Sequence, residues 1–307
     1  MGFRFSGHET FPCRYTWLPK AHAAISSDPL TFADEEKAMI GLGVGKNMVR
    51  AIRFWMQAAL VASPRDAGGY NITPFGNVIL GQKGFDPFLE DVRTLWLVHW
   101  HFSTHVEEPL FAWDFLLNSW PHPEVSRSAV LTAFRGEADR QNRPVSDITL
   151  EQHFDIFLHT YVPTRSRKGD IQEDNLDCPL VELELLQQVG ERRLDGSGRR
   201  ETIYAFRREE KPEITAELFA YCLHDFWTRR HPNERTLAFK DVAFGHGSPG
   251  QVFKLPEWDV RHRLEAVAED TGGYFRYSES AALQQVFRKE GAPPELLAAV
   301  YEGGARC

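Results

Sequence analysis

The chain has 307 residues and a net charge of −8 at pH 7, with 25% of its residues charged. This length accommodates two or three domains, and an apolar content of 42% with eight Trp and 22 Phe favours large packed cores over disorder. The acidic balance excludes a protein coated in basic surface for indiscriminate nucleic-acid binding, although local basic patches remain compatible with DNA contact.

The four cysteines, at positions 13, 178, 222 and 307, are scattered and form no CxxC pair. This spacing predicts neither a disulfide framework nor a cysteine-rich zinc site. A reducing cytoplasm is therefore the expected location. Because no apolar run approaches the length of about 18 residues that spans a bilayer, we expect no membrane partner.

Residues 41–79, together with a short helix that precedes them, have the pattern of a helix-turn-helix followed by a β wing. The acidic run 34–39 begins a short helix, and the glycines at positions 41, 43 and 45 end it. Asn47 is expected to cap the next helix, because its side-chain oxygen can accept a backbone N–H of the first turn. In that helix, apolar side chains recur at helical spacing and are expected to face a core: Met48, Ile52, Trp55 and Met56.

The other side of this helix carries the residues that we predict to contact DNA: Lys46, Asn47, Arg50 and Arg53. The arginines suit phosphate contacts, and Asn47 suits base recognition. The wing is expected to have strands at 60–61 and 70–72 and its tip at 66–69, and Thr73-Pro74 opens the next helix. A helix and wing in this order fit a DNA groove. A protein-docking module is the alternative.

The rest of the chain predicts a helical block and a smaller α+β region. Helical patterns occupy 87–105, 108–120, 125–141 and 149–162, and a polar connector follows at 163–177. Beyond the connector we expect a hairpin at 192–207, helices at 214–230 and 257–270, and a strand at 274–279. The predicted fold is thus mainly α with small β wings (α+β). Its three domains are an N-terminal segment with the winged helix (1–85), a helical domain (86–162) and a C-terminal α+β domain that resembles a second winged helix (163–307).

Two groups of residues contain side chains that could act in catalysis or bind a metal ion. In the aromatic N-terminal segment, His8, Glu9 and Arg14 form a polar cluster that could supply acid/base groups and a phosphate contact. A packed edge against the core is the alternative for this segment. In the connector, the carboxylates of Glu173, Asp174 and Asp177 could hold Mg²⁺, and a solvated loop is the alternative there.

The run 5–20 also resembles the beginning of the DUF4007 family, a domain of unknown function. The matching pattern is F-x-GHETF-x-x-R-x-x-WL-x-K, which ends here at Lys20. Further matches follow at 42–49, 52–55, 89–100, 173–180 and 248–255. The resemblance therefore covers nearly the whole chain.

The resemblance implies a role in bacterial DNA phosphorothioation and antiviral defence. Members of the family lie beside a sulfur-transfer protein and an ATPase, and they correspond to the B component of the Ssp system, a DNA-nicking protein. The implied partners are therefore double-stranded DNA, the sulfur-transfer protein and the ATPase. If the chain nicks DNA, Mg²⁺ or Mn²⁺ is the expected cofactor and no organic cofactor is expected.

The residues leave several alternatives open. The candidate metal ligands are Asp174 and Asp177, with Glu173 as a further candidate catalytic residue and His8 and Glu9 as the alternative catalytic pair. A non-catalytic winged-helix adaptor or a transcriptional regulator is the competing function. A symmetric DNA-binding protein is often a homodimer, so a homodimer is included among the expected partners.

Overall fold

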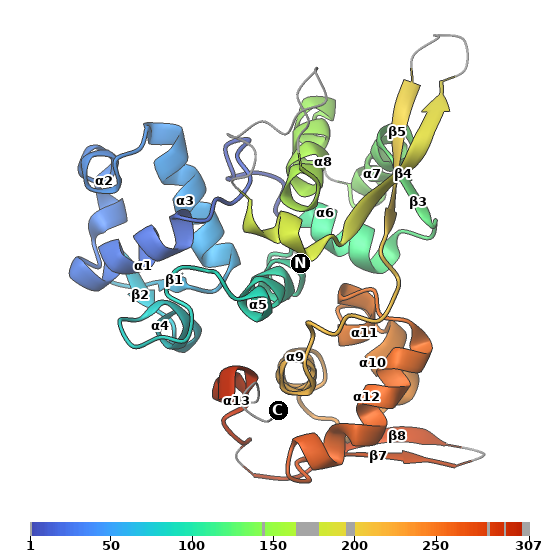
Figure 1. Ribbon diagram of the computed structural model, residues 1–307. Coiled ribbons are helices and arrows are strands. Elements are labelled where there is room, and N and C mark those ends of the chain that lie inside the picture. Colours follow the sequence, from blue (N-terminus) through green and yellow to red (C-terminus); the bar gives the residue numbers. More distant parts are fainter. Residues whose placement is uncertain are drawn as a thin grey trace.

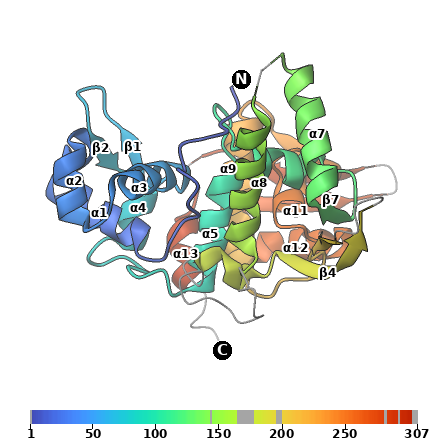
Figure 2. The ribbon, with the colours of Figure 1, turned by 90° about the horizontal axis from the view of Figure 1, so that it is seen from above.

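The computed structural model describes residues 2–142, 145–163, 178–194, 200–280, 283–291 and 293–302. Within these residues the fold is mixed, with helices gathered beside small antiparallel sheets. Figure 1 shows a first group of helices (α1–α4, blue to teal) on the left, a second (α5–α8, teal and green) in the centre and upper right, and a third (α9–α13, orange and red) below. Seen from above, the first group lies to one side of the other two (Figure 2).

The first group contains four α-helices, a 3₁₀ helix and a hairpin: α1 (Trp17–Ser27), η1 (Thr31–Ala33), α2 (Glu35–Leu42), α3 (Lys46–Ala58), β1 (Ala62–Pro64), β2 (Tyr70–Ile72) and α4 (Pro74–Leu80). Side-chain caps set two of the helix starts, as the residue types at those positions predict. The Asp34 carboxylate accepts the backbone N–H groups of Glu36 and Lys37 at the start of α2. The Thr73 hydroxyl accepts that of Gly76 at the start of α4.

Two expectations for this region are wrong. The N-cap of α3 is Gly45, and Asn47 is the second residue of the helix. The reason is that the Val49 N–H already bonds to the Gly45 carbonyl, which begins the helical ladder two residues earlier. The first strand of the hairpin begins at Ala62, because Leu60 has a φ of 54° and turns the chain at the end of α3.

One side of α3 is buried against the N-terminal segment and the second group. Ile52, Trp55 and Met56 are fully buried, as the spacing predicts, and Met48 is half-buried against the same core. The Trp55 indole N–H donates to the Phe11 carbonyl across 2.9 Å. The N-terminal segment is therefore fastened to α3 before α1 begins.

The centre of the molecule is α5 (Val92–Ser103), which is buried on nearly all sides. His99 links it to two other parts of the chain: its Nδ1 lies 2.7 Å from the Tyr161 hydroxyl and its Nε2 lies 3.1 Å from the Val252 carbonyl. α6 (Phe111–Asp114) follows and continues as a π-helix, η2 (Phe115–Ser119).

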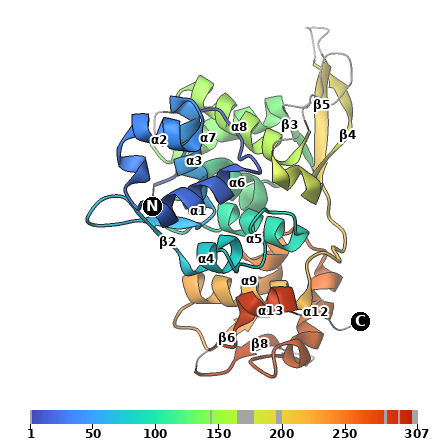
Figure 3. The ribbon, with the colours of Figure 1, turned by 60° about the vertical axis from the view of Figure 1, so that its left-hand side comes forward.

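The second group is completed by β3 (Glu124–Ser126), α7 (Arg127–Arg140), α8 (Asp147–Tyr161), the 3₁₀ helix η4 (Pro179–Leu183), β4 (Leu186–Arg193) and β5 (Arg200–Phe206). The sheet order is β3-β5-β4, with Val125 opposite Tyr204. This sheet joins residues on both sides of the expected boundary at 162/163. The β4–β5 hairpin projects from the body of the molecule (Figure 3).

The third group contains α9 (Ala216–Arg230), β6 (Thr236–Ala238), α10 (Phe239–Phe244), α11 (Pro249–Val252), α12 (Glu257–Asp270), β7 (Phe275–Glu279), β8 (Gln284–Arg288) and α13 (Leu296–Glu302). Its sheet order is β6-β8-β7. The second and third groups therefore share one arrangement: the first strand pairs with the last, and helices lie between the first and second strands. No helix in the described part of the chain is long and apolar enough to cross a membrane.

Candidate nucleic-acid interface

The exposed side of α3 carries a row of cationic and polar side chains. Lys46 and Asn47 are exposed, and Arg50 and Arg53 are half-exposed. Lys46, Arg50 and Arg53 are spaced four and three residues apart, a spacing that places side chains on one face of a helix. The structure thus brings the four residues predicted from the sequence to one surface, which we call the α3 face.

Glu35 lies between two of these cations. Its carboxylate lies 3.0 Å from the Lys46 Nζ and accepts a hydrogen bond of 2.8 Å from the Arg50 Nε. Hydrogen bonds from Arg50 and then Lys46 lower the pKa of Glu35 to about 2. Glu35 therefore remains charged, holds both side chains in place and offsets part of their positive charge. Sequence reasoning missed it, because α2 and α3 meet only in the folded chain.

Arg53 has no such counter-charge among the residues that the structure describes. Its guanidinium makes neither an ion pair nor a hydrogen bond there, so its N–H donors are available to an anion. Arg4, which sequence reasoning also missed, lies with its guanidinium 4.4 Å from the centre of the Phe54 ring. Burial is the main cause that lowers the pKa of Arg4; the nearby Glu108 carboxylate acts in the opposite direction, and the positive charge of Arg53 adds a smaller lowering effect. The α3 face thus ends in two neighbouring cations.

His8 is a buried structural link and is only 4% exposed. Its Nε2 lies 3.2 Å from the His153 Nδ1, and the His153 Nε2 accepts the Ala112 N–H across 3.0 Å. Burial lowers the pKa of His8 to about 4 and that of His153 well below its usual value. Both rings are therefore neutral near pH 7, and the pair fastens the N-terminal segment to α6 and α8.

The turn around His8 has an unusual backbone. Gly7, Glu9 and Thr10 have φ values of 110°, 49° and 62°. Two non-glycine residues in the left-handed region are strained, and such strain persists only where the surroundings hold it. Gly7 packs so closely on Phe54 that a β-carbon there would lie 2.7 Å from the ring. The turn brings the Glu9 carboxylate near Arg50, whose pKa it helps to raise after the larger effect of Glu35.

Arg14 lies on the same N-terminal segment, and its side chain packs against aromatic rings. Its guanidinium is 5.3 Å from the centre of the Trp17 ring and 5.8 Å from that of Phe11. Contacts of this length with aromatic rings orient a cation and cover its apolar stem. Arg14 is therefore held by the aromatic residues whose density is visible in the sequence.

A metal site made by protein side chains alone is not found in the described part of the chain. There, no three His, Cys, Asp or Glu side chains gather into a metal-binding group. Glu173, Asp174 and Asp177 lie outside the described residues. Mg²⁺ commonly takes only one or two carboxylates and completes its shell with water and substrate phosphates.

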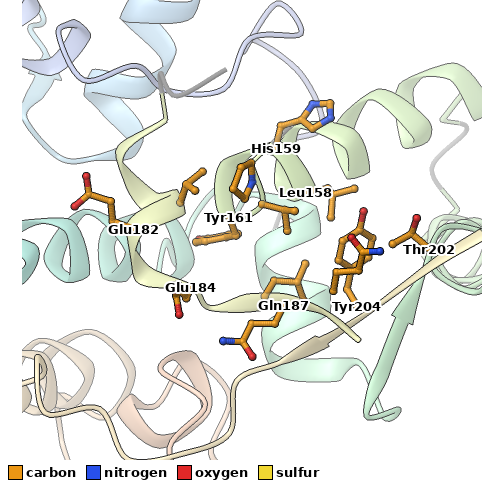
Figure 4. Close-up of a pocket in the computed structure, with 13 residues that line it drawn as sticks. Leu158, His159, Tyr161, Glu182, Glu184, Gln187, Thr202 and Tyr204 are labelled. Carbon is orange, nitrogen blue, oxygen red and sulfur yellow. The ribbon is translucent and has the colours of Figure 1, made fainter. Parts of the chain in front are cut away.

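A cavity of about 670 Å³ lies between the end of α8 and the β4–β5 hairpin. In Figure 4, Leu158, His159 and Tyr161 come from α8, and Gln187, Thr202 and Tyr204 come from the two strands. Glu182 and Glu184 also line this cavity, and the Glu182 carboxylate accepts the hydroxyl of Tyr15. The carboxylates make the cavity unsuited to phosphate, so the cationic surface on α3 is the better candidate for a nucleic-acid contact.

The fold and the α3 face define a protein of mixed helical and sheet structure that presents an exposed cationic helix. A family model described as "Protein of unknown function (DUF4007)" matches residues 5–301, and the chain belongs to this family. The resemblance predicted from the sequence is thereby confirmed.

Two solved structures are similar to the chain over nearly its whole length. They are described as "Magnesium ion-bound SspB crystal structure" and "SspB crystal structure". Each is 26% identical, with a TM-score of 0.82, and the match covers 98% of this chain and 87% of the other. No curated protein matches the chain.

Proposed function

We propose that the chain is the DNA-binding component of a bacterial DNA phosphorothioate modification and defence system of the Ssp type. Membership of the DUF4007 family and the similarity to two SspB structures support this assignment. In such a system the partners are double-stranded DNA, a sulfur-transfer protein and an ATPase. The setting is the cytoplasm, where these partners meet.

The proposed DNA-binding module is a winged helix-turn-helix formed by α2, α3 and the β1–β2 hairpin. In this module α3 is the recognition helix and the hairpin is the wing. The observation that carries the proposal is the α3 face, where Arg53 has no counter-charge within the described residues and Arg4 lies beside it. The unpaired guanidinium of Arg53 on the exposed side of α3 suits a DNA phosphate, because charge-assisted hydrogen bonds to phosphate oxygens are strong.

Different residues of the module have different roles in this proposal. Arg50, Arg53 and Lys46 contact phosphates, which fixes the position of the duplex. Asn47 lies at the exposed first turn of α3 and can form paired hydrogen bonds with adenine in the major groove. Arg14 is a further phosphate contact from the N-terminal segment.

We further propose that the protein nicks one strand of the bound duplex with Mg²⁺ or Mn²⁺, so that a partner can introduce sulfur. The magnesium ion in one of the similar SspB structures supports the metal dependence. Glu173, Asp174 and Asp177 remain the proposed metal and catalytic residues. The buried, neutral state of His8 makes that residue better suited to holding the N-terminal segment than to exchanging protons with a substrate.

A plasmid assay tests the nicking activity. Purified protein is incubated with supercoiled plasmid in Mg²⁺, in Mn²⁺ and in EDTA, and conversion to open circles is followed on a gel. Metal-dependent conversion that is lost in Asp174→Ala supports the nickase. Stable binding without conversion contradicts the nickase and supports the alternative, a non-catalytic adaptor or regulator whose partners carry out the chemistry.

A further inference from the structure

A second polar cluster lies where the third group meets the π-helix. Asp114, the last residue of α6, is 6% exposed. Its Oδ1 lies 2.7 Å from the Nε2 of His246, which is on the loop between α10 and α11. The His246 side chain is 45% exposed. A buried carboxylate thus orients an imidazole whose other side faces solvent.

The bond to Asp114 determines which nitrogen of His246 can react. A carboxylate is a hydrogen-bond acceptor, so the Nε2 of the neutral imidazole carries the hydrogen and donates it to Asp114. The Nδ1 then keeps its lone pair. Within the described residues Nδ1 makes no hydrogen bond. In many enzymes a carboxylate holds a histidine in the same way, and the free ring nitrogen of that histidine acts as the general base.

Arg230, the last residue of α9, lies against the same loop. A β-carbon built on Gly247 would be 3.2 Å from the Arg230 Nε and Nη2. Burial lowers the pKa of Arg230, and the nearby Asp114 only partly compensates. Its neighbour Arg229 is paired with Asp225 at 2.8 Å. The Arg230 guanidinium makes no ion pair or hydrogen bond with any residue that the structure describes, so it is a half-buried cation in need of an anion.

The surrounding backbone holds these groups in place. Asn118, in the π-helix, accepts the Gly247 N–H across 2.8 Å and donates to the Asp114 carbonyl across 3.0 Å. Gly247 has a φ of 75°, which glycine tolerates and which leaves room for Arg230. π-helical turns of this kind are frequent at functional sites. Phe244, at the end of α10, is 52% exposed and offers a ring for stacking beside the loop.

We propose that Asp114, His246 and Arg230 form a phosphodiester-hydrolysis site, which we call the Asp114–His246 site. Its substrate is a DNA phosphodiester: Arg230 binds the phosphate, His246 activates water and Asp114 orients His246. This assignment rests on the proposed nicking function. It adds the residues that bind the phosphate and activate water, and the metal ion stays assigned to the connector carboxylates proposed above.

The step is a hydrolysis without change of oxidation state. The Nδ1 of His246 removes a proton from water as the water oxygen forms a bond to phosphorus. The bond from phosphorus to one ester oxygen breaks, and that oxygen takes a proton from the imidazolium or from solvent. A phosphodiester and water thus become a phosphomonoester and a free hydroxyl, and Arg230 balances the charge that develops on the phosphate.

The test compares nicking of supercoiled plasmid and DNA binding in wild type, His246→Ala, Asp114→Asn and Arg230→Ala. We expect His246→Ala to lower the nicking rate about 100-fold or more and to leave binding within twofold. Added imidazole should restore part of the lost rate, which a purely structural role of His246 would not allow. His262→Ala is the matched control, because His262 is exposed on α12 and has no hydrogen bond within the described residues.

The possible outcomes distinguish a failure of the Asp114–His246 site from a failure of the proposed nicking function. Wild-type nicking that His246→Ala leaves unchanged overturns the Asp114–His246 site and leaves the nickase standing. Wild-type binding without any nicking overturns the site and the nickase, while the DNA-binding role stands. A loss of nicking in His246→Ala with restored rate in imidazole supports the site. Unchanged melting temperatures of the variants ensure that the losses are not due to unfolding.

Discussion

The Glu35 carboxylate accepts a 2.8 Å hydrogen bond from the Arg50 Nε and thereby joins α2 to the exposed side of α3. The same carboxylate lies 3.0 Å from the Lys46 Nζ. One acidic residue therefore fixes two of the four side chains that the proposed function assigns to DNA. It also weakens the attraction of those side chains for phosphate, because DNA has to compete with Glu35 for them.

Removing this charge should strengthen DNA binding. In Glu35→Gln, Lys46 and Arg50 are released to contact phosphates, so we expect about threefold or greater affinity and a salt dependence steeper by up to about 1.8 in log–log slope. Fluorescence anisotropy with a labelled duplex measures both quantities. Glu36→Gln is the matched control, since Glu36 is exposed on the same helix and has no ion pair among the described residues. Weaker binding by Glu35→Gln would show that Glu35 orients the cations more than it opposes DNA.

Asn47 and Arg53 should affect binding in different ways. Asn47→Ala should relax sequence preference, because a lost base contact costs discrimination of about 1–3 kcal/mol at one position. Arg53→Ala should weaken binding to all duplexes alike, because phosphate contacts carry no sequence information. Selection of bound duplexes from a random pool, followed by competition binding, separates the two effects. An unchanged selected motif for Asn47→Ala would remove its base-recognition role.

The packing of Gly7 on Phe54 predicts a loss of stability on substitution. Gly7→Ala places a methyl group 2.7 Å from the Phe54 ring and forces alanine to a φ of 110°. We expect the free energy of unfolding to fall by about 1–3 kcal/mol, measured by urea denaturation. Gly41→Ala is the control: no heavy atom lies near its β-carbon position, and alanine favours the helix by up to about 1 kcal/mol. Equal stability of the two variants would contradict the tight turn.

The His8–His153 pair predicts a loss of stability in mild acid. The folded pKa of His8 is about 4, below its usual value of 6.5, because the ring is buried. Between these pH values the unfolded chain binds more protons than the folded one, so stability falls as the pH is lowered from about 6.5 to about 4. For His8 alone the loss approaches about 3 kcal/mol.

Unfolding by urea at several pH values checks this dependence. His8→Gln should show a shallower fall in the free energy of unfolding than wild type between pH 6.5 and 4, whatever its stability at pH 7. The same slope in both proteins would mean that His8 is not buried as a neutral ring.

The parts of the fold that the sequence predicts correctly are those set by residues close together in the chain, such as single helices, single strands and helix caps. The helix at 257–270 and the strand at 70–72 were predicted with the bounds that the structure gives them, and Thr73 caps α4 as its side chain indicates. By contrast, β3 (Glu124–Ser126) overlaps the first two residues of the segment 125–141, for which the sequence predicts a helix. Its partner β5 lies far along the chain, and no pattern of a few residues specifies a pairing over that distance.

The candidate site likewise has some residues that the sequence identifies and others that only the folded structure brings there. The α3 face follows from helical spacing, so Lys46, Arg50 and Arg53 could be assigned to one surface from the sequence alone. Glu35 and Arg4 reach that surface through tertiary packing, and Asp114 meets His246 only because α6 lies against the loop before α11. The family motif at 248–255 begins two residues after His246 and covers α11, so it indicated neither His246 nor its partner.

The central claim is that the α3 face binds DNA, and salt-dependent binding of the double variant Arg50→Ala/Arg53→Ala tests it most directly. Anisotropy titrations of a labelled duplex at about 50 to 200 mM NaCl give the affinity and its salt slope. We predict an affinity about tenfold or more below wild type and a slope lower by about 1.8, as for two lost phosphate contacts. An affinity and slope equal to those of wild type, with the melting temperature unchanged, would contradict the claim.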